Sequence, residues 1–198
     1  MNESYIKKFK DYLDLIFKAL NGRKLNSNNI REKVVAGYLS LAIQHHSSII
    51  LLVERNVYSS AFALLRPLFE SVYRGIWFSI VSNDDELEKF CKKINYKFKP
   101  IKTLAKEIDE KEGRKAFVTV CEKILEFLHG MTHGGIGQIS RQFDKEGSVF
   151  VSFSDKDLSS LLNNANVLIS RLLIEYDKFQ DDNTLKKLGE EIIRNKFE

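Results

Sequence analysis

The sequence predicts an all-α fold, an up-and-down helical bundle. Along most of the chain, apolar residues recur three and four positions apart, the spacing that places them on one face of an α-helix. Two prolines and ten glycines among 198 residues are too few for a collagen-like or linker-dominated chain. The length suits one domain with its own core. We therefore expect a single domain over residues 1–198, in which 1–22 and 183–198 form peripheral helices.

Eight helices are expected, and several are bounded by residues that start or stop a helix. Asn21-Gly22 stops the first, Asn83 can cap the fourth, and Ser154 opens a capping box whose acid is Asp157. Pro67 lies inside the third helix and predicts a kink there, because proline removes one backbone donor. The expected ranges are about 5–20, 30–55, 58–81, 85–94, 100–108, 112–129, 155–179 and 183–195.

One short segment has the pattern of a β-hairpin instead of a helix. The stretches 139–143 and 149–153 flank a Lys-Glu-Gly-Ser turn and could pair with each other. We therefore expect a small hairpin near residues 139–153, as an excursion from the bundle.

Charge and cysteine content point to the cytoplasm. The chain has 31 basic and 27 acidic residues, and its net charge of +4 is too small to imply nucleic acid by itself. Cys91 and Cys121 are too few for a disulfide framework or a cysteine-based zinc site. Residues 34–53 carry no charge over the length of a membrane span. The five polar residues 44–48 in their middle predict a buried helix instead, with no membrane and no cofactor expected.

The first candidate site lies on the third predicted helix. Arg66, Glu70 and Arg74 follow one another in steps of four, which places them on one helix face with the acid between two bases. Two guanidiniums held by a shared carboxylate can form a rigid fork for a phosphate or a carboxylate. The alternative is an intrahelical ladder of salt bridges on a solvated face.

The second candidate is the segment 128–141, which combines histidines, glycines and an arginine. Glycines after a helix allow backbone donors to approach an anion, while His129, His133 and Arg141 can bind or protonate a phosphate. The alternative is a loop whose glycines only supply positive φ angles at the helix end. The remaining candidate ligand-binding residues of this loop are Gly134, Gly135 and Gln138.

Metal and basic-surface alternatives are weaker. Glu126, His129 and His133 have the spacing of half a di-iron site, but the second Glu-x-x-His that such bundles need is missing. His45 and His46, in an uncharged helix, are more typical of neutral, hydrogen-bonded histidines than of catalytic ones. The stretch 89–102 contains six lysines, no acid and three interleaved aromatics. It resembles a single-strand binding surface, although a solvated face with inward aromatics is favoured.

Two blocks resemble a known group of proteins. Residues 58–70, YSSAFALLRPLFE, resemble a helix of uncharacterised bacterial all-helical proteins. His133-Gly134-Gly135, followed by Gln138 and Arg141, resembles their later HGG loop. Those families are similar to the HEPN superfamily, helical nucleotide-binding domains common in toxin–antitoxin and phage-defence loci. The resemblance covers about residues 30–171, and it implies an RNA or nucleotide ligand and a partner protein from the same locus. A homodimer is expected because long amphipathic helices in small bundles often present a second apolar face.

The chain departs from the HEPN pattern at one point. HEPN ribonucleases carry an arginine followed, after four to six residues, by a histidine. Here neither Arg66 nor Arg74 is followed by a histidine, and the arginine nearest before His129 is Arg114, fifteen residues upstream. Metal-independent cleavage of RNA would therefore require Arg66 or Arg74 to meet His133 or Arg141 across two helices.

Two functions of different classes follow. In the first, a HEPN-like cleft binds or cleaves RNA or a nucleotide: Arg66, Arg74 and Arg141 hold the phosphate, Glu70 orients the arginines, and His133 is the hydrogen-bond donor or general acid and base. In the second, the protein is a non-enzymatic interaction protein and the same side chains form a structural network. The two differ in whether Arg66 and His133 meet at the surface or in a closed interior.

Overall fold

The computed structural model describes residues 3–24, 29–143, 149, 153–180 and 182–195, and these are helical almost throughout. No strand occurs among them, which confirms the predicted all-α class. The α-helices are α1 (Glu3–Leu20), α2 (Ile30–Glu54), α3 (Tyr58–Ile80), α4 (Asp84–Lys92), α5 (Ile101–Glu112), α6 (Ala116–Thr132), α7 (Ile136–Ile139), α8 (Asp155–Tyr176) and α9 (Thr184–Arg194). Two 3₁₀ turns are η1 (Ser140–Gln142) and η2 (Asp177–Phe179).

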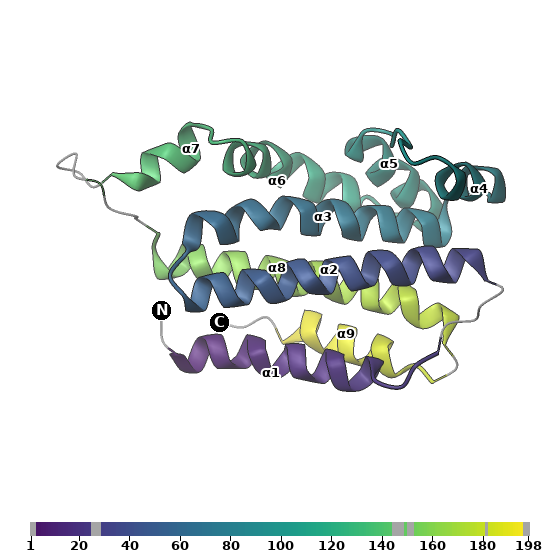
Figure 1. Cartoon of the computed structure of the whole chain (residues 1–198), viewed down its shortest axis with the longest axis horizontal. Helices are drawn as coiled ribbons and strands as arrows, with labels where there is room; N and C mark the ends of the chain where they lie inside the picture. The colour runs from purple at the N-terminus through teal and green to yellow at the C-terminus, as the bar shows by residue number, and fades with distance from the viewer. Residues whose placement is uncertain (1–2, 25–28, 144–148, 150–152, 181, 196–198) are drawn as a thin grey trace.

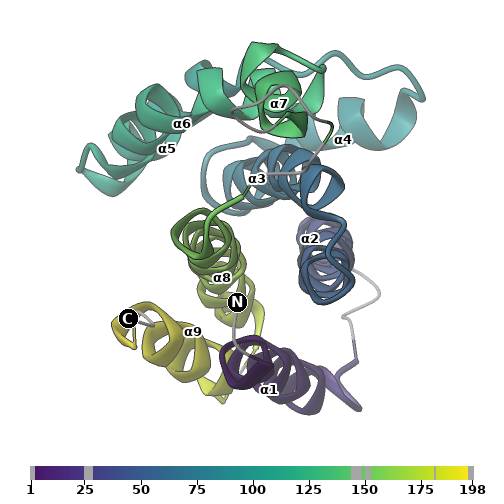
Figure 2. The same ribbon diagram turned by 90° about the vertical axis from the view of Figure 1, so that its left-hand side faces the viewer.

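The helices form three layers (Figure 1 and Figure 2). The central layer contains α2, α3 and α8, each of which contacts the other two. Helices α5 and α6 pair with each other and pack on α3, while α1 and α9 lie together on the opposite side. Within the central layer, α3 therefore packs against α2 and α8 on one side and against the α5–α6 pair on the other.

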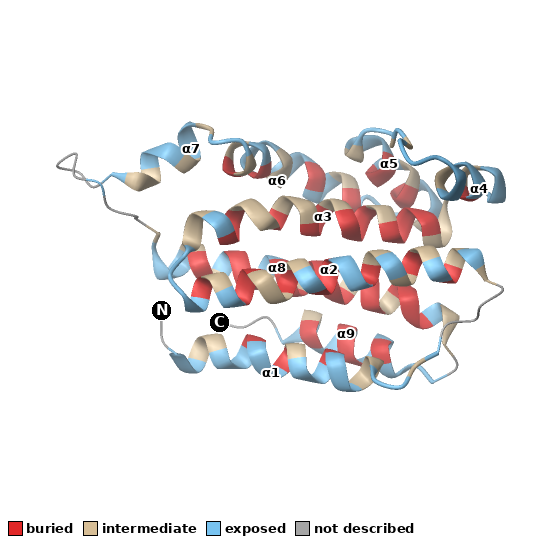
Figure 3. Cartoon of the chain, viewed as in Figure 1, coloured by how far each residue is buried: buried red, intermediate tan, exposed pale blue. Residues whose placement is uncertain are grey.

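The core is richest in aromatic side chains along α3, because that helix is covered on several sides (Figure 3). Phe69, Tyr73, Trp77 and Phe78 are each at most 2% exposed. Their rings contact one another and the rings of neighbouring helices, with Tyr73 edge-on to Phe117 at 5.2 Å between centroids. Burial of such large apolar surfaces supplies most of the driving force for packing.

Helices α2 and α3 form an antiparallel pair that is fastened at both ends. At one end only residues 55–57 connect them. At the other end, the guanidinium of Arg31 donates to the carbonyl oxygens of Phe78 (2.6 Å) and Ser82 (2.8 Å) and to the carboxylate of Asp84 (2.8 Å). A cation at the C-terminal end of α3 satisfies carbonyls that lack helical partners.

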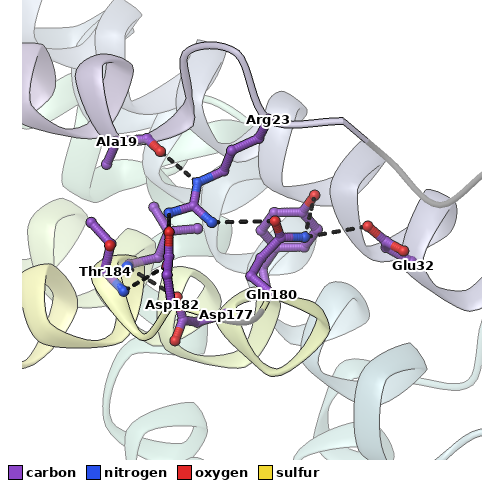
Figure 4. A network of polar contacts seen from close by, with 9 residues as sticks. Ala19, Arg23, Glu32, Asp177, Gln180, Asp182 and Thr184 are labelled. Atoms are coloured by element: carbon purple, nitrogen blue, oxygen red, sulfur yellow. Dashed lines mark hydrogen bonds and ion pairs between the residues drawn. The ribbon is translucent and has the colours of Figure 1, made fainter.

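A polar network fastens α1 to the segment before α9 (Figure 4). The guanidinium of Arg23 donates to the carbonyl of Ala19 (2.5 Å), to Gln180 (3.2 Å) and to both carboxylate oxygens of Asp182 (3.0 Å each). The amide of Gln180 in turn donates to Glu32 of α2 at 3.3 Å. These contacts join three segments that are distant in the sequence.

The prediction of a hairpin near 139–153 is wrong for its first strand, residues 139–143. Residues 139–142 are helical, because α7 begins directly after the Gly134-Gly135 turn and continues into η1. Phe143 and Val149 form one isolated antiparallel bridge. Residues 144–148 and 150–152 lie outside the described part of the chain.

The boundaries around α5 and α6 also differ from the expectation. Gly113 adopts a left-handed conformation (φ +69°) and ends α5 after Glu112, so α6 begins at Ala116. The carboxylate of Asp109, only 4% exposed, caps α6 by accepting hydrogen bonds from the amides of Phe117 (2.9 Å) and Val118 (2.8 Å). Pro67 lies inside α3, which is continuous over its whole range, and the kink expected there stays a prediction.

Replacing Asp109 by alanine is expected to lower the free energy of unfolding by about 2 kcal/mol, because two amides at the start of α6 lose their acceptor. Asp109→Asn retains one oxygen acceptor and should cost less. Urea unfolding of both variants measures the difference. Equal stability of Asp109→Ala and the parent would show that the cap is unimportant.

Helix α2 is long and apolar enough to cross a membrane by length and composition alone. In the structure it packs against α3 and α8, and His46 in its middle is fully buried. The same hydropathy suits a core helix of a bundle. The cytoplasmic location therefore stays a prediction.

Candidate functional site

The predicted ladder on α3 is present. Glu70 bridges the two arginines: its carboxylate accepts from Nε of Arg66 (3.0 Å) and from Nη2 of Arg74 (2.7 Å). The α-helical period brings all three onto one face, as the four-residue spacing predicts. Their side chains are 22–29% exposed, so the group is at the surface but partly shielded from solvent.

Packing of α6 on α3 adds a histidine to this ladder. Nη1 of Arg66 lies 2.8 Å from Nδ1 of His129, and the His129 residue is exposed. A guanidinium cannot accept a hydrogen bond, so Nδ1 must be the acceptor and the ring is neutral with its proton on Nε2. In this contact, therefore, Nδ1 of His129 accepts and Nε2 remains as the donor.

His133 lies one helical turn further along α6. Its ring centroid is 4.7 Å from that of His129, and the residue is exposed at the C-cap of the helix. His129 thus contacts both Arg66 and His133, and the expectation that Arg66 and His133 form one site stays a prediction. We call Arg66, Glu70, Arg74, His129 and His133 the α3–α6 cluster.

The far end of the cluster is formed by Arg74. Its guanidinium carbon lies 4.3 Å from the centroid of the Phe98 ring, a cation–π distance. Its Nε is buried and has no hydrogen-bond partner among the described residues. The guanidinium of Arg74 therefore keeps one N–H donor without an acceptor, which a bound ligand could use.

The glycines after α6 have a clear structural role. Gly134 has φ +67°, and the amide of Gly135 donates to the carbonyl of Gly130 at 2.8 Å, which together form a Schellman end to the helix. A Cβ at Gly135 would lie 2.9 Å from Cα of Gly130. This geometry matches the alternative in which the glycines end a helix. A role for them in ligand binding stays a prediction.

Arg141 makes its contacts away from the cluster. Its guanidinium pairs with the carboxylate of Asp157 at 3.1 Å and lies 5.0 Å from the centroid of the Phe153 ring. Asp157 is also the acid of the predicted Ser154 capping box, which the structure contains. Gln138 is half-buried, and its carbonyl accepts from the side chain of Gln142. Among the described residues, neither Arg141 nor Gln138 forms a hydrogen bond or ion pair with the α3–α6 cluster.

The other sequence candidates are also placed. His46 is buried against α8, where its Nε2 lies 2.7 Å from Oδ1 of Asn166, and burial lowers its pKa to about 4. The aromatics of the basic stretch pack together, with 4.9 Å between the ring centroids of Tyr96 and Phe98, as the favoured alternative predicts. Within the described ranges no group of three potential metal ligands gathers.

The comparisons with known proteins identify a family but no function. The sequence matches a family of unknown function (DUF6988) over residues 39–187, about three quarters of the chain, so the protein belongs to this family. The match covers both helices of the α3–α6 cluster. Neither the curated proteins nor the solved structures contain a match to the chain.

Proposed function

We propose that this member of the DUF6988 family binds a phosphate group of RNA or of a nucleotide at the α3–α6 cluster. The observation that carries the proposal is the 2.8 Å hydrogen bond from Arg66 to Nδ1 of His129. It leaves the Nε2–H of an exposed imidazole as a donor beside a guanidinium that a carboxylate already orients. Donors of both types are common ligands of phosphate oxygens.

The charge of the cluster supports an anionic ligand. Arg66 and Arg74 carry two positive charges and Glu70 one negative charge, so these three side chains retain a net charge of +1. Because Glu70 holds both guanidiniums in place, less side-chain entropy is lost when a phosphate binds. The neighbouring His133 can add a further hydrogen-bond donor or act as a general acid or base.

The resemblance of residues 58–70 and of the HGG loop to HEPN-like proteins supports RNA as the carrier of that phosphate. The protein would then act as a homodimer in a bacterial toxin–antitoxin or phage-defence system, with a partner protein from the same locus. If RNA is cleaved, a 2′-hydroxyl oxygen attacks the adjacent phosphorus and the 5′-oxygen leaves. His133 then takes the proton from the 2′-hydroxyl and delivers a proton to the leaving 5′-oxygen, without a metal.

Binding is tested with fluorescence anisotropy of a labelled single-stranded RNA. Arg66→Met is expected to weaken binding about tenfold or more, because a charge-assisted hydrogen bond is lost. Arg55→Met removes the same charge from an exposed position at the end of α2 and is the matched control. Equal affinity of Arg66→Met and Arg55→Met would refute the proposal.

The competing function, a structural network in an interaction protein, rests on the same contacts. It predicts that Arg66→Met lowers the melting temperature and that the parent does not bind RNA. His133→Ala separates binding from cleavage, since this exposed residue can be removed without disturbing the core. Retained RNA cleavage in His133→Ala would exclude the catalytic role of His133.

A further inference from the structure

A largely apolar pocket shares no lining residue with the α3–α6 cluster. Its volume is about 300 Å³, and residues of α3, α6, α8 and α9 line it. Apolar side chains from all four helices line it, among them Val72, Phe117, Val120, Leu168 and Ile193. A pocket of this size and lining is typical of small-molecule sites.

Two arginines from different elements also line this pocket. Arg171 belongs to α8, and Arg114 to the connection between α5 and α6. Both guanidinium carbons lie over the Phe117 ring, at 5.3 Å for Arg171 and 5.9 Å for Arg114. The ring therefore joins the apolar wall to the charged part of the pocket.

The charge of this pocket is incompletely balanced. Glu112 pairs with Arg171 at 3.2 Å and with Arg114 at 2.5 Å, so one carboxylate serves two guanidiniums and a net charge of +1 remains on these three side chains. The nearby start of α6 does not provide the anion donors, because Asp109 already accepts from the amides of Phe117 and Val118. The guanidiniums remain as the donors for a ligand.

We propose that this pocket binds a small amphipathic anion, a carboxylate that carries an unbranched aliphatic chain. The carboxylate binds the guanidiniums of Arg114 and Arg171, and the chain lies among the apolar side chains between α6, α8 and α9. A volume of about 300 Å³ corresponds to roughly ten water-sized groups, which suits a chain of about eight carbons. Because none of these residues belongs to the α3–α6 cluster, the proposal is independent of RNA binding.

Isothermal titration of the full chain with octanoate tests the site, and octylamine, of the same length and opposite charge, is the control ligand. Octanoate is expected to bind and octylamine is not. Arg171→Met should weaken octanoate binding about tenfold, whereas the exposed Arg55→Met, which removes the same charge elsewhere, should leave it unchanged. Equal binding of the two ligands by the parent, or no binding of octanoate, would overturn the proposal.

A second variant keeps the test valid if Arg171→Met fails to fold. Val120 lines the pocket but is 40% exposed, so Val120→Trp fills the space with little disturbance of the core and leaves all charges in place. Circular dichroism verifies that the variant is helical. Loss of octanoate binding in folded Val120→Trp supports this location, and undiminished binding contradicts it.

Discussion

Lowering the pH from 7 to 4 is expected to reduce the free energy of unfolding by about 3 kcal/mol through His46 alone. Burial lowers the pKa of this imidazole from 6.5 to about 4 in the folded protein. Between these two values the unfolded state binds more protons than the folded state, so stability is lost as the pH falls. The size follows from about 1.4 kcal/mol per pKa unit.

The pKa of His46 is low because a second proton would have to bind at its buried Nδ1. Nε2 of His46 is occupied by its contact with Asn166, and Nδ1 is buried without a hydrogen-bond partner among the described residues. Protonation would place an N–H and a charge in an apolar environment.

Urea unfolding at several pH values measures this effect. The difference in stability between pH 7 and pH 4.5 should be clearly smaller in His46→Gln than in the parent. His45→Gln is the matched control, since the adjacent His45 is only partly buried and its pKa is lowered less. An identical pH dependence in His46→Gln and the parent would show that His46 does not determine acid stability.

Gly189→Ala is expected to destabilise the protein by roughly 2–3 kcal/mol, because α9 approaches α8 too closely for a side chain. A Cβ at Gly189 would lie 2.8 Å from the carbonyl oxygen of Ser170 and 2.8 Å from Cγ1 of Ile174. The carbonyl belongs to the α8 backbone and cannot move aside as a flexible side chain can. The two helices would therefore have to separate.

Gly37→Ala provides the opposite result in the same experiment. Gly37 is exposed in the middle of α2, and a Cβ there would meet nothing within 4 Å. Alanine should therefore stabilise this helix by about 0.5–1 kcal/mol, since glycine loses more backbone entropy on folding. Thermal unfolding should rank the proteins as Gly37→Ala, parent and Gly189→Ala; a Gly189→Ala variant as stable as the parent would contradict the close packing.

The sequence predicts the fold well where the apolar period is continuous and poorly where a helix boundary depends on distant groups. The ranges of α2 and α3 agree closely with expectation, because their apolar runs are continuous and Asn29 caps α2 locally by accepting from the amide of Glu32. The start of α6 was misplaced because its cap is Asp109, eight residues before Phe117. Residues 139–143 precede a Lys-Glu-Gly-Ser turn, as the first strand of a hairpin would, but a new helix begins after the turn at Gly134 and includes residues 139–142.

In the candidate site, likewise, contacts within one helix could be predicted from the sequence and contacts between helices could not. The contacts of Arg66, Glu70 and Arg74 follow from spacing along one helix. That Arg66 meets His129 depends on which face of α6 packs against α3, and no local pattern in the sequence encodes it. For the same reason Arg141 could not be assigned to Asp157 from the sequence, although the capping role of Asp157 could.

The contacts at both ends of the α2–α3 pair favour its formation early in folding. Only three residues separate the two helices, so closing this hairpin costs little chain entropy. Once Arg31 has bound the carbonyls at the end of α3, both ends of the pair are held before any distant segment has arrived. We therefore expect this helical hairpin to form first and to serve as the template on which α8 and then the outer helices condense.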